Sequence, residues 1–310
     1  MDVLVTGGLG YIGSVLVPLL DGDERVDRVV VMDDTSTGSP SALRGALTDG
    51  IDFRQGDVRE YGNVESAMRG CDAVVNLAAI TGASSTHDRR EETFATNLEG
   101  TENVLTAAGK LGVENVVVAS SCNLYGRATS TDLDETVEPD PINPYAETKY
   151  ECEGLLREAI DEFGFDGVAL RMATNYGDAP GVRFNLVVNT FVFRALTGRP
   201  LTVYGDGSNW RPFIHVRDAA RAYAHAALDP GAWDRLVYNV GSNGGNYRIS
   251  EIADLVADEV APVNVTYLED EHPGPSYHVN FDRIAETGYE TAWTLREGVR
   301  DLANTFEPNS

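Results

Sequence analysis

A tyrosine and a lysine four residues apart form a pattern in this sequence that could do chemistry. They occur as Tyr145 and Lys149 in the segment NPYAETKYECE, residues 143–153. Residues i and i+4 share one face of a helix, and Asn143 and Pro144 suit the N-cap and the first helical position. A nearby ammonium stabilises a phenolate and lowers the pKa of the tyrosine from its usual value of about 10. The pair can therefore act as a general base toward a hydroxyl group.

The rarity of lysine supports a chemical role for Lys149. Of the 24 lysines and arginines in the chain, only Lys110 and Lys149 are lysines. An arginine would supply the same charge, but its broad planar fork is not the same compact donor. Ser121 lies upstream in SSCNLYG, directly after the apolar run NVVVASS. A serine at the carboxyl end of a strand can hydrogen-bond a substrate oxygen beside the tyrosine.

A glycine-rich turn follows the first apolar run of the chain. In VLVTGGLGYIGS, Gly7, Gly10 and Gly13 fit GxxGxxG, and Gly8, Gly10 and Gly13 fit GxGxxG. Either pattern lets backbone N–H groups approach a pyrophosphate at the positive end of the following helix. Asp33 ends the next apolar run at about 20 residues beyond Gly13, the spacing typical of the acid that bonds the adenine ribose. Its carboxylate would repel the 2′-phosphate of NADP, so NAD is the predicted cofactor.

Alternating strands and helices are predicted to position these groups. Buried strands are predicted at residues 2–7, 28–34, 72–79, 115–121 and 167–173. Helices are predicted at residues 11–22, 64–70, 91–112, 143–164 and 249–260. This alternation indicates an α/β fold with a doubly wound parallel sheet, the Rossmann fold. We expect a Rossmann domain at residues 1–175, to which later segments return, and a smaller C-terminal, mainly substrate-binding lobe at residues 176–310.

Composition narrows the classes of protein. The net charge of −25 disfavours nucleic acid as a partner, because no cationic surface is available to displace counterions. The sequence shows neither a signal peptide nor an apolar run long enough to cross a membrane, so we expect a cytoplasmic protein. High acidity with little lysine favours a cytoplasm of high salt concentration. Cys71, Cys122 and Cys152 are too few and too scattered for a zinc site, and no metal is predicted.

The motifs together resemble those of the extended short-chain dehydrogenases/reductases, in the NAD-dependent sugar epimerase/dehydratase family typified by UDP-glucose 4-epimerase. The resemblance covers nearly the whole chain, in TGGLGYIG, MDDTSTG, GDVRE, NLAA, NLEGT, SSCNLYG, NPYAETK, RPFIHVRDAARA and YNVGS. It implies a nucleotide-sugar or sugar-phosphate substrate. It also implies a homodimer, formed through the helices around residues 91–109 and 144–163.

The resemblance assigns roles by position. The catalytic residues that it implies are Ser121, Tyr145 and Lys149. Its cofactor-binding residues are Gly7, Gly10, Tyr11, Ile12, Gly13, Asp33, Asp57, Val58, Leu77, Ala78, Ala79, Asn97, Tyr145 and Lys149. Its substrate-binding residues are Ser121, Thr174, Asn175, Asn185 and Arg211. For His215 and Asp218 we expect a structural role.

Departures from the family pattern narrow the range of expected reactions and substrates. Sugar-nucleotide 4,6-dehydratases have an Asp-Glu pair after the catalytic hydroxyl, where this chain has Cys122 and Asn123, so dehydration is not expected. His272 stands near the position of a second diphosphate-binding arginine, which argues against UDP specifically. Pro212 after Arg211 replaces the usual aspartate. These changes favour another nucleotide sugar or a smaller sugar phosphate.

The leading hypothesis is a nucleotide-sugar epimerase that holds NAD tightly and acts at C4. A net sugar dehydrogenase or 4-keto-sugar reductase of the same fold is the main alternative, and no single residue separates the two. A nucleotide-sensing protein without catalysis is a third possibility, because fold alone does not establish activity. The presence of Ser121, Tyr145 and Lys149 argues against a sensor, which needs no base.

Overall fold

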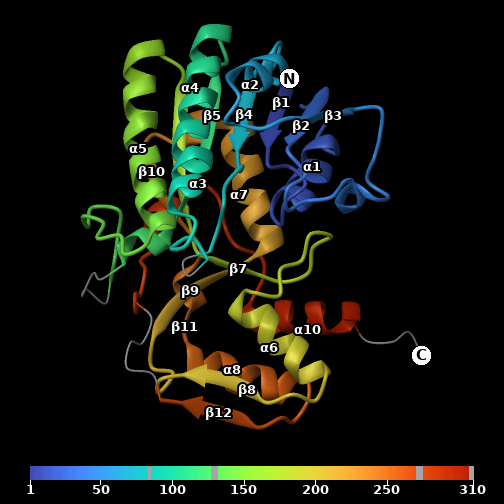
Figure 1. Ribbon diagram of the computed structural model, residues 1–310, viewed down its shortest axis with the longest axis vertical. Coiled ribbons are helices and arrows are strands. Elements are labelled where there is room, and N and C mark those ends of the chain that lie inside the picture. The colour runs from blue at the N-terminus through green and yellow to red at the C-terminus, as the bar shows by residue number, and fades with distance from the viewer. Residues whose placement is uncertain (83–84, 127–131, 270–274, 307–310) are drawn as a thin grey trace.

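A parallel sheet forms the centre of the computed structural model, which describes residues 1–82, 85–126, 132–269 and 275–306 (Figure 1). Within these residues the sheet has seven strands in the order β10-β6-β5-β4-β1-β2-β3, all parallel. Their bounds are β1 Asp2–Thr6, β2 Arg28–Asp33, β3 Ile51–Gln55, β4 Ala73–Asn76, β5 Asn115–Ser121, β6 Asp166–Met172 and β10 Val237–Val240. The predicted α/β class and doubly wound parallel sheet are confirmed.

Two edge strands were absent from the sequence prediction, for different reasons. β3 has the sequence IDFRQ and is partly exposed along its whole length, so it lacks the apolar run of a buried strand. β10 has the sequence VYNV and lies far along the chain, yet it pairs with β6. Its place in the sheet depends on the chain returning from the smaller lobe, which local sequence does not encode.

Helices cover both faces of the large sheet. Alternate residues of β1 face opposite ways: Val3 and Val5 pack with α1 (Gly13–Asp21) and α7 (Val216–Leu228), whereas Leu4 packs against the other layer. That layer contains α2 (Tyr61–Met68), α4 (Gly100–Leu111) and α5 (Pro144–Phe163). Burial on both faces explains why the strands consist of continuous Val and Leu runs.

The helix predicted at 91–112 is interrupted. It consists of α3 (Arg90–Phe94), a π-helical turn (Ala95–Glu99) and α4. The extra residue of a π-turn shifts the side chains that follow, and such turns are frequent at functional sites. This turn contains Asn97, one of the residues predicted to support the cofactor site.

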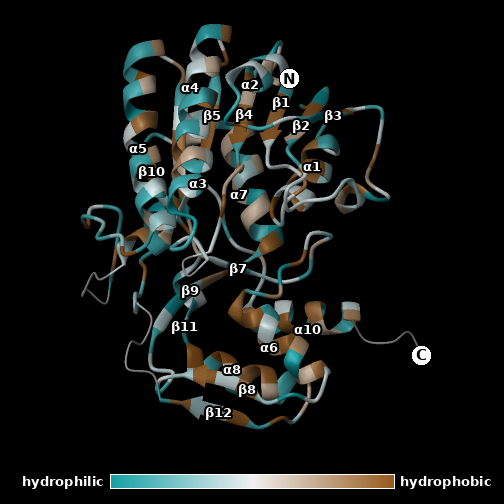
Figure 2. Ribbon diagram, viewed as in Figure 1, coloured by the Kyte–Doolittle hydropathy of each residue, from teal (hydrophilic) through white to brown (hydrophobic). Residues whose placement is uncertain are grey.

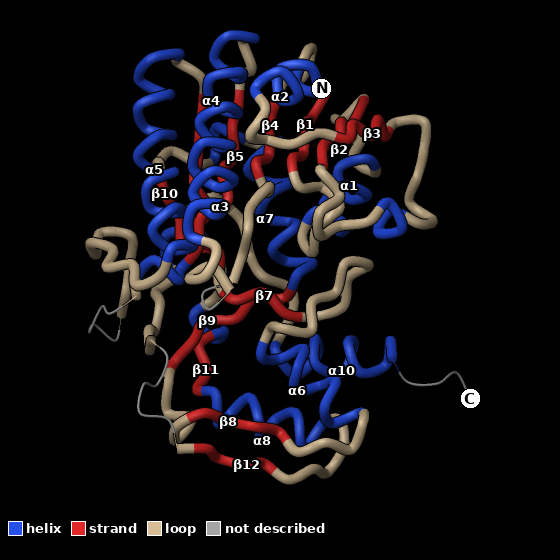
Figure 3. Tube along the Cα trace, in the orientation of Figure 1, coloured by secondary structure: helices blue, strands red, loops and turns tan. Residues whose placement is uncertain are grey.

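A smaller set of elements lies beyond the carboxyl ends of the large sheet. It comprises β7 (Thr174–Tyr176), β9 (Trp210–His215) and β11 (Asn246–Arg248) in one sheet, and β8 (Leu201–Tyr204) with β12 (Val265–Leu268) in another. Helices α6 (Val187–Leu196), α8 (Ile249–Glu259) and α10 (Leu295–Phe306) supply its core. Figure 2 shows hydrophobic residues on α6 and α8, and Figure 3 places β8 and β12 at the end farthest from the large sheet.

The remaining helices are short. They are α9 (Asp282–Ala285) and the 3-10 turns Pro40–Leu43, Cys122–Tyr125, Pro230–Ala232 and Asn243–Gly245. In the described part of the chain, no helix combines the length and the apolar composition that crossing a lipid bilayer would require.

Candidate functional site

The three predicted catalytic residues meet at the carboxyl end of the large sheet. Ser121 is the last residue of β5, and Tyr145 and Lys149 lie on the first turns of α5. The predicted helix start is confirmed: the Asn143 side chain accepts a hydrogen bond from the Ala146 N–H at 3.0 Å, and a proline occupies the first helical position. The cap fixes where α5 begins, and helical periodicity then turns the phenol and the amine to one side.

The environment of Tyr145 differs from the prediction. Burial raises the pKa of the Tyr145 phenol above its ordinary value, although a hydrogen bond with the Ser121 side chain and the charge of Arg183 act in the opposite direction. The Lys149 ammonium lies 5.9 Å from the centre of the tyrosine ring. The raised pKa therefore differs from the lowering expected from Lys149, because in the folded chain removal from water outweighs the Ser121 hydrogen bond and the Arg183 charge.

Lys149 is itself held in a dry environment. Its residue is 4% exposed, and burial lowers the pKa of its ammonium. A buried ammonium gains from an acceptor that arrives with a ligand. The residue is thus suited to hold the hydroxyl groups of a bound ribose beside the tyrosine.

The glycine turn is packed so closely that a side chain at Gly7 or Gly13 would clash with neighbouring backbone atoms. Gly7 has a φ of +66°, and a Cβ there would lie 2.8 Å from the Ala78 backbone nitrogen. A Cβ on Gly13 would lie 2.6 Å from the Gly7 carbonyl oxygen. A Cβ on Gly8 would instead meet the Val31 side chain at 2.7 Å, toward the core. Gly8 therefore serves packing, and Gly7, Gly10 and Gly13 are the better match to a pyrophosphate turn.

We predict that Gly13→Ala weakens NAD binding by at least about tenfold, or about 1.4 kcal/mol. The added methyl group would push the turn apart where the backbone must approach the pyrophosphate. Calorimetric titration of the cofactor-stripped protein with NAD measures the effect. Gly62→Ala on α2, where a Cβ meets nothing within 4 Å, is the matched control and should bind NAD like the parent. Equal affinity of both variants would remove the turn from the cofactor site.

Asp33 joins the glycine turn to the end of β2. Its carboxylate accepts hydrogen bonds from the Leu9 N–H at 3.1 Å and the Thr35 N–H at 2.8 Å. The residue is 8% exposed, and burial raises the pKa of its carboxyl group. Asp57 has a different environment, since its carboxylate pairs with the guanidinium of Arg59 at the surface. Asp33 is therefore the acid that the turn itself positions.

Asn97 connects the segment behind the cofactor site to the catalytic helix. Its side-chain oxygen accepts from the Ile80 N–H at 2.7 Å, and its amide nitrogen donates to the Ile80 carbonyl and the Thr148 hydroxyl. The Ala78 N–H donates to the Thr6 hydroxyl at 3.2 Å. The predicted cofactor residues Leu77, Ala78 and Ala79 are thus held between β1 and the helix that carries Lys149. Val58 is buried against Gly100 at the start of α4.

Of the predicted substrate residues, some approach the catalytic groups and one lies at the surface. Thr174 and Asn175 are on β7, and Thr174 hydrogen-bonds the phenol of Tyr277. The Arg211 guanidinium packs over the Tyr277 ring, 4.6 Å from its centre. The Asn175 side-chain oxygen is buried without a hydrogen-bond partner among the described residues. Asn185 is exposed and accepts a hydrogen bond from Arg183.

Two residues in this region, Tyr277 and Arg183, were missed by the sequence analysis. Tyr277 approaches the Asn123 side-chain amide at 3.5 Å and contributes to the electrostatic environment of Tyr145. Arg183 lies in a loop before α6 and donates to the Thr81 hydroxyl. Both are on irregular segments without periodicity or a recognised motif. The one available signal was the proximity of Arg183 to Asn185 in the sequence.

The two residues after Ser121 cannot act as an acid and a base on a substrate. The Cys122 thiol is buried and donates to the Arg171 carbonyl at 3.0 Å, and burial raises its pKa. The Asn123 side chain accepts from the Asn143 amide at 2.8 Å. An amide does not titrate, and a thiol bonded into the core has no route to the site.

His215 and Asp218 lie at a joint between β9, α7 and the C-terminal segment. The His215 ring stacks on Trp293 with centres 4.3 Å apart. The Asp218 carboxylate accepts from the backbone N–H groups of Ala292 and Trp293. These contacts agree with the structural role expected for both residues. His272, singled out for its bearing on the diphosphate site, lies outside the described residues.

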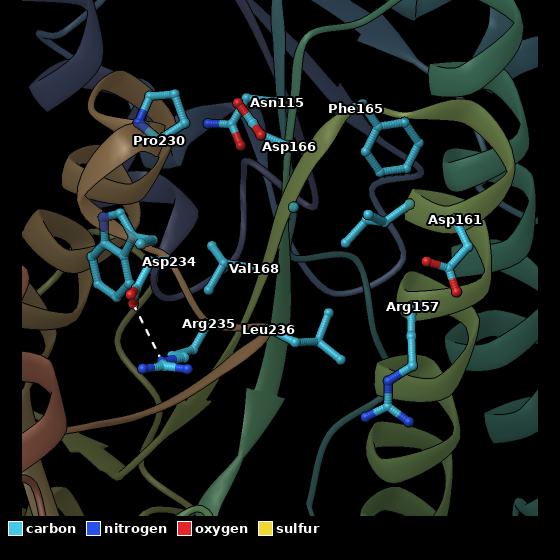
Figure 4. Close-up of a pocket in the computed structure, with 13 residues that line it drawn as sticks. Asn115, Arg157, Asp161, Phe165, Asp166, Val168, Pro230, Asp234, Arg235 and Leu236 are labelled. Atoms are coloured by element: carbon cyan, nitrogen blue, oxygen red, sulfur yellow. Dashed lines mark ion pairs between the residues drawn. The ribbon is translucent and has the colours of Figure 1, made fainter.

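A separate cavity of about 350 Å³ opens at the opposite edge of the sheet (Figure 4). It lies where β5 and β6 begin, at Asn115 and Asp166, whereas Ser121 ends β5 at the other edge. Arg157 and Asp161 on α5 line one side, and Arg235 lies on another. None of the predicted site residues lines this cavity, so the candidate active site does not extend into it.

The parallel sheet, the glycine turn and a serine facing a tyrosine-lysine pair define an extended short-chain dehydrogenase/reductase. The NAD dependent epimerase/dehydratase family matches residues 3–241, and the chain belongs to this family. Membership confirms NAD as the cofactor predicted from the sequence.

Relatives with different reactions share the fold. The chain is 30% identical over 312 residues to the low-salt glycan biosynthesis protein Agl12 of Haloferax volcanii, covering 99% of this chain and 98% of Agl12. UDP-glucose 4-epimerase of Thermus thermophilus, solved with NAD, is 29% identical with a TM-score of 0.85 and 99% coverage of both chains. DesIV of Streptomyces venezuelae, a dTDP-glucose 4,6-dehydratase, is 28% identical with a TM-score of 0.88, covering 98% and 96%.

Proposed function

We propose that this protein is a nucleotide-sugar epimerase that inverts C4 of the sugar by transient hydride transfer to tightly bound NAD. The observation that carries the proposal is the pairing of Ser121 with Tyr145 at the carboxyl end of β5, beside a glycine turn suited to a dinucleotide. NAD, when bound, accepts hydride from the sugar carbon and returns it. Side chains of the protein transfer the proton and orient the substrate and the cofactor.

Tyr145 is the proposed general base. Its phenolate oxygen takes the proton from the C4 hydroxyl as the C4–H bond breaks, which leaves a 4-keto sugar. Ser121 hydrogen-bonds the same sugar oxygen and orients it. After the keto sugar presents its other face, Tyr145 returns the proton to the oxygen as hydride returns to carbon, so no atom is gained or lost. Lys149 holds the cofactor ribose and adds positive charge near the phenolate.

The side chains predicted to contact substrate suit a nucleotide diphosphate. Arg211 is the charged candidate for the diphosphate, and its stacking on Tyr277 fixes its direction. Thr174 and Asn175 offer hydrogen-bonding groups on β7, and the buried Asn175 side-chain oxygen has no hydrogen-bond partner among the described residues, so it would gain from a donor. These contacts support a nucleotide-sugar substrate more than a bare sugar.

Water elimination, the reaction named for DesIV, is disfavoured at this site. That reaction needs an acid and a base at the positions of Cys122 and Asn123. The thiol donates into the core and the amide is bonded to Asn143. A change of reaction within a shared fold requires only such local changes. A net dehydrogenase or 4-keto-sugar reductase is the alternative that the side chains leave open.

The proposed reaction predicts near-stoichiometric NAD in the purified protein, because an epimerase returns hydride before it releases the cofactor. Denaturing the protein and assaying the released NAD measures the content. Incubation with a panel of nucleotide sugars, followed by NMR of the sugar, should show inversion at C4 without accumulation of NADH. Empty protein with net NADH formation would establish the dehydrogenase instead. Loss of water from the sugar would establish a dehydratase.

We also propose a cytoplasmic homodimer in a high-salt cell. Helices α4 and α5, which contain most of the segments expected at the dimer interface, lie side by side on one face of the molecule (Figure 1). The net charge of −25 and the scarcity of lysine support the high-salt environment, where screening reduces self-repulsion. The relative from Haloferax volcanii is consistent with this setting.

A further inference from the structure

A loop of the smaller lobe packs against the glycine turn. The loop is residues 177–186, between β7 and α6. Its apolar side chains cluster with the side chain of Tyr11, which belongs to the turn. A Cβ on Gly181 would lie 3.3 Å from the Gly10 carbonyl, and the Gly181 N–H donates to the Ser14 hydroxyl at 3.4 Å. The loop therefore contacts the segment that is predicted to hold the cofactor pyrophosphate.

A buried amide holds the same loop in place. Asn189, near the start of α6, is 0% exposed. Its Nδ2 donates to the Tyr11 hydroxyl at 3.1 Å and to the Arg183 carbonyl at 3.0 Å. Its Oδ1 accepts from the Gly177 N–H at 3.0 Å, and the Tyr11 hydroxyl donates to the Gly177 carbonyl at 2.6 Å. The backbone of Arg183 is therefore fixed relative to the glycine turn.

The Arg183 guanidinium contacts a second segment that touches the turn. It donates to the hydroxyl of Thr81, beyond the end of β4. The residue before Thr81 is hydrogen-bonded through both its N–H and its carbonyl to the Asn97 side chain. A Cβ on Gly7 would lie 2.8 Å from the backbone nitrogen of Ala78, in the same segment. The backbone and the guanidinium of Arg183 are thus each tied to a segment in contact with the glycine turn.

The positive charge of Arg183 has no carboxylate partner within the described ranges of the chain. Its guanidinium donates there to two neutral oxygens, those of the Thr81 side chain and of the Asn185 side chain, the latter at 3.3 Å. The residue is partly buried, and burial lowers the pKa of the guanidinium because the charge has lost part of its water. The buried Arg171, by contrast, is paired with Glu153. A desolvated cation gains from an anion, and phosphate oxygens match the planar fork of arginine.

We propose that Arg183 is a cofactor-binding residue, whose guanidinium donates to the pyrophosphate of NAD while the glycine turn contributes backbone N–H groups. The pyrophosphate is the anion for which the turn is suited, and Arg183 is the cation that the loop ties to the turn. The inference rests on the NAD cofactor of the family and not on the proposed sugar reaction. It adds a residue of the smaller lobe to a site otherwise formed by the large sheet and its helices.

The test compares ligands with and without the pyrophosphate. Cofactor-stripped protein is titrated with NAD and ADP-ribose by calorimetry, and with adenosine by ligand-observed NMR. Arg183→Gln should weaken the binding of NAD and ADP-ribose by about tenfold, because hydrogen bonds to a charged group are lost. Its affinity for adenosine, which has no phosphate, should stay within about twofold of the parent. Arg183→Lys keeps the charge without the fork and should lose less affinity than Arg183→Gln.

Arg199→Gln, a change at an exposed arginine of the same lobe, is the matched control. It should bind all three ligands like the parent. The control removes the same charge from a chain whose net charge is −25, so it separates a local contact from a general loss of positive charge.

Unchanged affinity of Arg183→Gln for NAD and ADP-ribose would overturn the proposal. Equal weakening of all three ligands would overturn it as well, because the loop would then have lost its structure and not a phosphate contact. A diphosphate can also arrive with a nucleotide sugar, so UDP and dTDP are titrated into the NAD-loaded proteins. Weaker binding of UDP or dTDP with unchanged binding of NAD would assign Arg183 to the substrate and reject it as a cofactor residue.

Thr81→Val gives the decision if Arg183→Gln fails to fold, because it removes an acceptor that holds the guanidinium. Weaker binding of ADP-ribose with unchanged binding of adenosine supports the proposal. An unchanged affinity for ADP-ribose, or an equal loss for both ligands, overturns it. None of these titrations needs a sugar substrate, so their failure is distinct from a failure of the proposed epimerase reaction.

Discussion

Tyr145→Phe is expected to lower turnover by about 10³-fold while NAD remains bound. The substitution removes one oxygen, the atom proposed to take the proton from the sugar hydroxyl, and keeps the ring that packs beside Lys149. The glycine turn and Asp33 are untouched, so the cofactor should still co-purify with the variant. Initial rates on the nucleotide sugar found active with the parent enzyme measure the loss.

Tyr150→Phe on the same helix is the matched control. Tyr150 follows Lys149 on α5, and its hydroxyl donates to Glu138 at 2.5 Å. The control should keep turnover within about twofold of the parent, because the Tyr150 hydroxyl has no proposed role in the reaction. Loss of its hydrogen bond at the surface should also cost little stability. Full activity in Tyr145→Phe would reject the phenol as the base. Loss of NAD from that variant would mean that the tyrosine serves binding more than proton transfer.

Glu153→Gln is expected to destabilise the fold by about 3–5 kcal/mol. Glu153 and Arg171 form an ion pair whose side chains are 4% and 5% exposed, with nitrogen–oxygen distances of 2.9 and 2.7 Å. The Ser120 hydroxyl also donates to Glu153, at 2.6 Å. Removing one charge leaves the Arg171 guanidinium buried without its counter-ion. Denaturant unfolding at a fixed salt concentration measures the change in free energy.

Two further variants test whether the unpaired charge of Arg171 causes the loss of stability. Glu65→Gln removes the partner of Arg69 in an exposed pair on α2 and should cost less than about 1 kcal/mol. Replacing both Glu153 and Arg171 with methionine should recover much of the stability, since no unpaired charge remains. A loss below about 1 kcal/mol in Glu153→Gln would show that water or another group reaches the arginine.

The buried pair also has a consequence for the site. Arg171 donates to the Tyr125 hydroxyl at 3.0 Å, and Tyr125 hydrogen-bonds Asn239 on β10. This network joins α5, β6 and β10 directly behind Ser121, at the edge where the catalytic groups lie. Its sequence signals are separate single residues, none of which indicated an ion pair. Tertiary contact alone brings them together.

Local patterns were the reliable part of the sequence prediction. Asn143 and Pro144 act within one turn of α5, and the buried strands are continuous apolar runs, so both could be read from neighbouring residues. The interruption at Ala95–Glu99 could not, because the hydrogen-bond partners of Asn97 in this turn, Ile80 and Thr148, are far from it in the sequence. Arg183 and Tyr277 were missed for the same reason, since their positions depend on loops.

The strand-helix order, the glycine turn with Asp33, and the spacing of Tyr145 and Lys149 could all be read from the amino-acid sequence. These features depend on periodicity and on groups close together in the chain. The charges that act on the Tyr145 phenol, and its loss of water, depend on the folded arrangement. Burial raised the pKa of Tyr145, and a cation from another lobe opposed that change. Desolvation and Coulombic interaction depend on distances in space, which residue spacing along the chain does not specify.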